Sequence, residues 1–151
     1  MSMLKHDTFF KVDHSQVQSY GDFVIMCLPN NLWISVKSNF ARERLLASGF
    51  STDIIGVGFF EDPTEFSSYV KIRNFQRAGF LAMYCPDIAV TTKQVQNNTS
   101  TYEEVIKAYT GRDMPLNING KPFIRPLSHL KKHLDKLLVE QDVRRRFIVD
   151  F

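Results

Sequence analysis

The side chains in this sequence best suited to contact another molecule are basic, and they cluster toward its end. The chain of 151 residues has a formal net charge of +3. Residues 121–151 carry eight lysines and arginines against four acids, whereas the first 120 residues have one excess acid. Clustered cations bind phosphates or carboxylates without needing an exact motif. We therefore predict a surface that binds nucleic acid or an acidic protein surface, made of His129, Lys131, Lys132, Lys136, Arg144, Arg145 and Arg146.

Most of these residues fall on one predicted helix, which begins after Pro126 and extends to about Arg144. Five leucines share one face of it, and the lysines and histidines between them are expected to face solvent. Cations near a helix C-terminus also complement the helix dipole by about 0.3–1 kcal/mol, so a purely solvated face is the alternative. No aromatic residue alternates with the basic ones, which argues against a platform for stacked single-stranded bases.

Metal binding and nucleophilic catalysis find little support in the sequence. His129 and His133 are spaced i, i+4, but the residues between them are Leu-Lys-Lys, so the glutamate of a zinc enzyme motif is missing and the lysines repel a cation. Cys27 and Cys85 lie in apolar stretches, where burial raises a thiol pKa and lowers its reactivity. We predict two buried, reduced thiols, no metal site and no cofactor, and we assign no catalytic residue.

One stretch, from Trp33 through Tyr69, has the order strand, capped helix, Gly49-Phe50, strand with Gly56-Val57-Gly58, and helix. It resembles the front half of the mono-ADP-ribosyltransferases, and this resemblance implies an enzyme that uses NAD. Such enzymes carry a catalytic glutamate late in the sheet, and residues 88–92 contain none. They also carry an early histidine or arginine, where residues 32–37 offer only Lys37.

Composition indicates a globular protein with an apolar core. Apolar residues make up 44% of the chain and charged residues 23%, which is typical of folded domains rather than disordered chains. The longest apolar run, residues 23–28, is too short to cross a bilayer, and the first residues have no apolar segment of a secretory signal. We therefore expect a cytoplasmic protein without a membrane partner.

The pattern of apolar stretches and turn signals predicts a sheet with helices. Strands are expected at residues 9–12, 23–28, 32–37, 53–60, 80–85 and 88–92, with hairpin turns at 29–31 and at Asn119-Gly120. Helices are expected after Ser38, after Asp62-Pro63 and after Ser100, in addition to the basic one. These elements predict an α+β fold in one compact domain over residues 1–151. It would have a small mixed, mostly antiparallel sheet and three to four helices, the last long and basic.

We interpret the chain as a small intracellular binding protein without catalysis of its own, which contacts nucleic acid or a protein partner through the basic C-terminal helix. An accessory or inhibitory factor of a virus or mobile element commonly has this form. The NAD-using enzyme is one alternative. A structural subunit that docks through the apolar segment Phe147–Phe151 is another.

Overall fold

Five of the six predicted strands, together with a strand at residues 124–126, form one six-stranded sheet in which neighbours in sequence are neighbours in space, in the order β1-β2-β3-β4-β5-β6. The computed structural model describes residues 9–11, 23–28, 31–38, 53–59, 63–139 and 151. The strands are β1 (Phe9–Lys11), β2 (Phe23–Ile25), β3 (Leu32–Ser38), β4 (Asp53–Phe59), β5 (Phe80–Cys85) and β6 (Ile124–Pro126).

Four α-helices and two short 3-10 helices follow or separate these strands. The α-helices are α2 (Tyr69–Arg77), α3 (Thr92–Asn97), α4 (Thr101–Lys107) and α5 (Leu130–Leu138). The 3-10 helices are η2 (Pro63–Phe66) and η3 (Leu127–His129). The prediction of an α+β fold with a mixed sheet is confirmed. The predicted continuation of the last helix to Arg144, and the helix predicted after Ser38, lie outside the described residues.

The balance of strand directions differs from the predicted, mostly antiparallel sheet. β1, β2 and β3 pair antiparallel, and the hairpin expected between residues 23–28 and 32–37 is present as Phe23 opposite Ile34. The remaining three of the five pairings, from β3 through β6, are parallel. The reason is that α2 connects β4 to β5, and α3 and α4 lie between β5 and β6. Crossovers of that kind place successive strands parallel.

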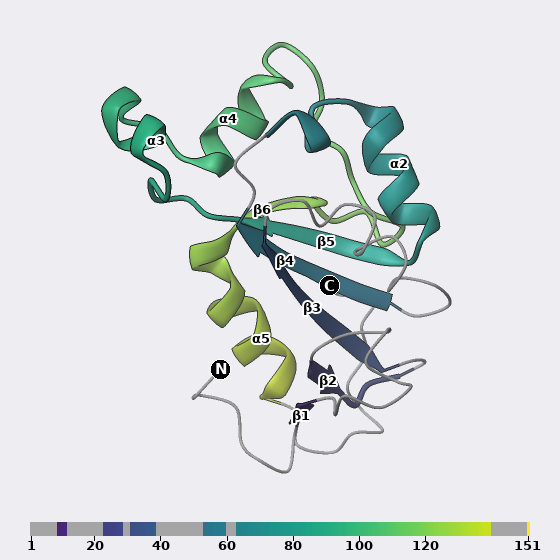
Figure 1. Ribbon diagram of the computed structural model, residues 1–151. Helices are drawn as coiled ribbons and strands as arrows, with labels where there is room; N and C mark the ends of the chain where they lie inside the picture. The colour runs from purple at the N-terminus through teal and green to yellow at the C-terminus, as the bar shows by residue number, and fades with distance from the viewer. Residues whose placement is uncertain (1–8, 12–22, 29–30, 39–52, 60–62, 140–150) are drawn as a thin grey trace.

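The two faces of the sheet carry separate cores, and Figure 1 shows α2 and α4 on one side and α5 on the other. The first, which we call the α2/α4 core, packs Phe66, Phe75 and Phe80 with Val105 and Tyr109. The second, the α5 core, packs the leucines of α5 against buried residues of β2 to β5. The leucine face predicted for the last helix is therefore confirmed over Leu127, Leu130, Leu134, Leu137 and Leu138.

A register shift in the pairing of β4 with β5 changes which side chains of β5 face each core. The pairing of β4 with β5 is irregular between Ile54 and Ile55, which lie opposite Phe80 and Ala82. Leu81 and Ala82 consequently both belong to the α5 core, while Phe80 and Met83 on either side belong to the α2/α4 core. Strict alternation would have put Leu81 and Ala82 on opposite faces, so the irregularity lets both side chains of β5 meet the α5 core.

Two local predictions are wrong: the start of a helix at Asp62-Pro63 and the strand at residues 88–92. In both cases a capping side chain further along the chain begins an α-helix. Ser68 caps α2 and accepts a hydrogen bond from Lys71 N, so Asp62-Pro63 precedes only the short η2. Tyr69 and Val70, the first residues of α2, are exposed, and Ile72 and Phe75 are buried. Residues 88–92 form no strand because Thr91 caps α3. Ser100, in contrast, caps α4 as its capping box predicts.

Candidate anion-binding pocket

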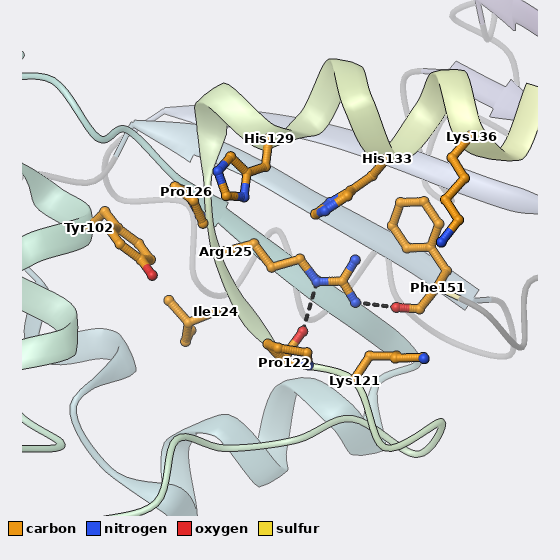
Figure 2. Close-up of a pocket in the computed structure, with 10 residues that line it drawn as sticks. All are labelled: Tyr102, Lys121, Pro122, Ile124, Arg125, Pro126, His129, His133, Lys136 and Phe151. Carbon is orange, nitrogen blue, oxygen red and sulfur yellow. Dashed lines mark hydrogen bonds between the residues drawn. The ribbon is translucent and has the colours of Figure 1, made fainter. Parts of the chain in front are cut away.

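A pocket of about 420 Å³ lies across the edge of the sheet, between β6, the start of α4 and the inner side of α5. It falls within the range of ligand sites, ~300–1,000 Å³. Figure 2 shows α5 above the pocket with His129, His133 and Lys136 pointing down toward Arg125. We call this site the edge pocket; its described lining residues are Tyr102, Lys121, Pro122, Ile124, Arg125, Pro126, His129, His133, Lys136 and Phe151.

Arg125 is the central side chain of the edge pocket and is only 6% exposed. Its Nε donates to the Pro122 carbonyl over 2.7 Å, and its Nη1 donates to Tyr84 Oη over 3.2 Å. Its Nη2 donates to the main-chain oxygen of Phe151, and the guanidinium lies 4.9 Å from the centre of the Phe151 ring and 5.7 Å from that of Tyr84. These contacts fix a buried positive charge beside the cavity.

Tyr84 links this arginine to α5. Its hydroxyl lies 2.7 Å from His133 Nδ1. Burial raises the pKa of Tyr84 to about 12, although nearby Arg125 acts against this, so the hydroxyl keeps its proton at neutral pH. Because Arg125 can only donate to the Tyr84 oxygen, the tyrosine proton is available for His133 Nδ1. A neutral His133 accepting at Nδ1 carries its own proton on Nε2.

The surroundings of His133 favour its neutral form. Partial burial first, and then the charges of Arg125, His129, Lys132 and Lys136, lower the pKa of the His133 imidazole below its ordinary value. Sequence analysis placed this histidine on the solvent side of the helix. In the structure it is partly buried, because α5 meets the sheet where Tyr84 and Arg125 reach toward it.

Asp87 positions the start of α5 from a different segment. Its carboxylate accepts from Ser128 N over 3.1 Å and also from the Ser128 hydroxyl. Burial alone would raise the pKa of Asp87, but these hydrogen bonds from Ser128, together with nearby His129, outweigh it and lower the pKa. The loop after β5 thus supplies the capping group that the 3-10 turn before α5 lacks in its own sequence.

The electrostatic character of the edge pocket is one-sided. Five of its ten described lining residues have basic side chains and none is an aspartate or glutamate. Three described acids lie close to lining residues and are bonded to groups outside the lining: Asp87 to Ser128, Glu103 to Ser100 and Asp135 to Lys131. The charge of Asp87 still acts on Tyr102 and His129. Positive charges set among apolar lining residues concentrate the electrostatic potential inside a cavity, and such a cavity attracts anions.

The predicted basic surface is divided by the structure. His129 and Lys136 line the edge pocket. Lys131 instead pairs with Asp135 one helical turn away, and Lys132 is exposed outside the pocket lining. Arg144, Arg145 and Arg146 lie outside the described residues. The proposed role of the whole set in binding therefore stays a prediction.

Sequence reasoning missed the residues that come from other elements. Lys121 and Arg125 were counted only as charges, and Tyr102 was not among the predicted site residues, yet all three line the edge pocket. The argument against base stacking considered only neighbours in sequence, whereas Tyr102 reaches the pocket from α4. The one available signal was Arg125 itself, a charge directly after the apolar pair Phe123-Ile124.

The other predicted chemistry is placed as follows. Cys27 and Cys85 are buried and neither forms a disulfide, as predicted, and burial raises the pKa of Cys85 to about 12. The described residues contain no group of three or more potential metal ligands. Of the stretch that resembles the mono-ADP-ribosyltransferases, β3 and β4 are present and pair parallel, and Tyr69 donates to the Asp113 carbonyl.

Comparison with known proteins does not extend this description: no protein family model, no curated protein and no solved structure matches the chain. Within the described part of the chain, no helix has both the length and the apolar character needed to cross a membrane.

Proposed function

We propose that this chain is a non-catalytic binding protein that holds the phosphate groups of a nucleic acid in the edge pocket. The observation that supports this is the convergence of Lys121, Arg125 and Lys136 on one concave site whose described lining has no aspartate or glutamate. Two of them, Lys121 and Lys136, are exposed and able to meet an incoming anion, while Arg125 is buried and fixed. Ligand binding then replaces repulsion among like charges with attraction.

The shape of the site favours nucleic acid over an acidic protein surface. Stable protein–protein contacts bury about 800 Å² per partner over a broad surface. The basic residues here instead surround a pocket of about 420 Å³. Phosphates and bases extend from a flexible strand and enter such a pocket readily, and Tyr102 offers an aromatic ring beside the cations.

The size of the pocket also limits how strongly binding depends on salt. Each phosphate neutralised on a single strand contributes a log–log slope of about −0.7. A pocket that accommodates one or two nucleotides predicts a total slope of about −0.7 to −1.4. A long basic helix with six engaged cations would give a slope of roughly −4.

Two substitutions on the same helix test the proposal. Lys136→Glu reverses a charge that lines the edge pocket, and Lys132→Glu makes the same change outside its lining. Fluorescence anisotropy with a labelled single-stranded oligonucleotide, at several salt concentrations, measures both affinities. We expect Lys136→Glu to weaken binding by about tenfold or more, and Lys132→Glu by only two- to threefold through the general field.

Equal effects of the two substitutions would assign binding to the whole helix surface and contradict the pocket. No saturable binding of any oligonucleotide at low salt would contradict the function itself. Salt-sensitive binding of an acidic peptide such as poly-glutamate, in place of the oligonucleotide, would replace nucleic acid by an acidic protein. Circular dichroism and thermal unfolding of both variants establish that each remains folded.

A further inference from the structure

The edge pocket has two chemically different ends. In Figure 2, Tyr102 lies at one side of the view, and Lys136 and Phe151 lie at the other. Ile124 and Pro126 lie nearer to Tyr102 than to Lys136 in this view, so the lining at that end is mostly apolar. The ligand that fits both ends has a planar apolar group and an anionic group in one molecule.

The basic end holds more charge than one phosphodiester requires. Lys121, Lys136 and the buried Arg125 line it together. A phosphodiester carries one negative charge, whereas a phosphomonoester carries about −1.5 to −2 at neutral pH. Arg125 already uses Nε, Nη1 and Nη2 in hydrogen bonds to protein groups, so it supplies fixed charge while the two lysines are free to make direct contacts.

Phe151 bounds the basic end. Its main-chain oxygen accepts hydrogen bonds from Arg125 and, over 3.2 Å, from Asn117 Nδ2. Its ring packs against the Arg125 guanidinium and at 6.1 Å from the His133 ring, and the residue is buried. Phe151 therefore occupies space on this side of the basic end, which favours a strand that ends in the pocket over one that continues past Phe151.

We infer that the edge pocket recognises a terminal nucleotide, with the phosphomonoester at Lys121 and Lys136 and the base beside Tyr102. This inference rests on the proposed binding of nucleic acid and specifies which part of the strand is bound. A free mononucleotide presents the same chemistry, so the test includes it. Binding here is recognition only, and no bond of the nucleotide is made or broken.

The experiment compares four probes on the unmodified protein. Three are one single-stranded sequence with a 5′-phosphate, with a 3′-phosphate or with hydroxyls at both ends, and the fourth is the corresponding nucleoside monophosphate. We expect one phosphorylated end to bind about tenfold more tightly than the hydroxyl-ended strand. If the mononucleotide competes at a similar concentration, the pocket recognises a single nucleotide with its phosphomonoester, and the free nucleotide is then its ligand.

Two variants locate the two ends. Lys136→Gln should abolish the preference for a phosphorylated end, so that the phosphorylated strand loses more affinity than the hydroxyl-ended strand does. Tyr102→Leu should weaken all nucleotide probes by a common factor of about five to a hundred, the usual range for one stacked base, and leave that preference intact. Lys132→Gln, which changes a lysine outside the pocket lining, is the matched control.

Equal affinity for all three strand ends, with binding still sensitive to Lys136→Glu, would overturn the terminal inference and leave the proposed function standing. Failure of every probe to bind would overturn both. Retained end preference in Lys136→Gln would place the phosphate elsewhere and would likewise overturn the inference.

Discussion

The two faces of the sheet bury different kinds of side chain. On the α2/α4 face, Phe75 packs against Phe66 with ring centres 5.4 Å apart and edge-on against Phe80 at 5.7 Å. On the α5 face, the leucines surround Tyr84, which is buried yet hydrogen-bonded to both Arg125 and His133. One face is nearly all hydrocarbon, and the other encloses a polar network.

This difference separates stability from recognition. Burying aromatic rings contributes directly to the free energy of folding. Burying a guanidinium adds little net stability, because its loss of hydration offsets what its hydrogen bonds gain. On the α5 face, the buried Arg125 guanidinium takes the place of an apolar side chain at the edge of the sheet. The edge pocket lies beside this guanidinium.

The largest effect on stability is expected from truncating one buried aromatic side chain on the α2/α4 face. Phe75→Ala removes a ring that is 1% exposed and packed between two others, so it should lower the free energy of unfolding by about 3–5 kcal/mol. Urea denaturation followed by circular dichroism measures the change. Where the variant still folds, its affinity for an oligonucleotide should equal that of the parent chain. A loss below about 1 kcal/mol would mean that this face is not the main source of stability.

A smaller effect is expected from removing one polar atom on the other face. Tyr84→Phe deletes the hydroxyl that joins Arg125 to His133 and should cost about 1–3 kcal/mol, the penalty for leaving buried partners unsatisfied. The same change should raise the pKa of His133, since the neutral ring loses the donor at Nδ1. Nuclear magnetic resonance titration of the imidazole measures this pKa. An unchanged pKa would show that the link does not hold the tautomer.

The pH dependence of stability should report on the same network with a smaller amplitude. Because the pKa of His133 is lowered in the folded chain, the unfolded chain binds a proton first as the pH falls. The contribution of His133 is therefore complete above about pH 6.5 and declines as acid is added down to the folded pKa. Comparing urea denaturation at pH 7.5 and 5.5 with that of His133→Gln isolates this residue. A variant with the same pH dependence as the parent chain would contradict the assignment.

The smallest effect concerns the surface of the apolar face. Val70 is 67% exposed on α2 although its helix covers the α2/α4 core. Val70→Ser should change the free energy of unfolding by no more than about 0.5 kcal/mol. The same denaturation experiment compared with Ile72→Ala, a buried neighbour two residues away, provides the contrast. A loss for Val70→Ser as large as that for Ile72→Ala would show that α2 turns a different face to the sheet.

The sequence predicted those features that depend on local chemistry. Five apolar stretches became β1 to β5, Ser100 capped its helix, and the leucines of α5 took one face, because propensity, capping and periodicity act within a few residues. Strand direction was predicted less well. It depends on how crossover helices pack, which no local pattern in residues 53–126 specifies.

The pocket was harder to predict for the same reason. Tyr102, Lys121, Arg125 and Phe151 come from four different segments and meet only after the sheet and α5 are assembled. The excess of basic residues pointed to the part of the chain that supplies most of the pocket lining. Periodicity, however, placed His133 toward solvent, because it carries no information about Tyr84 across the interface. The sequence gives the net charge of a region, whereas the positions of its charged side chains depend on how the helices and strands pack.

The edge strand β6 has a further consequence, which concerns self-association. It contributes only Ile124, Arg125 and Pro126 to the sheet, and Pro122 precedes it. Proline has no amide hydrogen, and a three-residue edge offers too few unpaired donors to act as a template for a strand from another molecule. The margin of the sheet that borders the pocket therefore stays open to a ligand without inviting cross-β aggregation at high protein concentration.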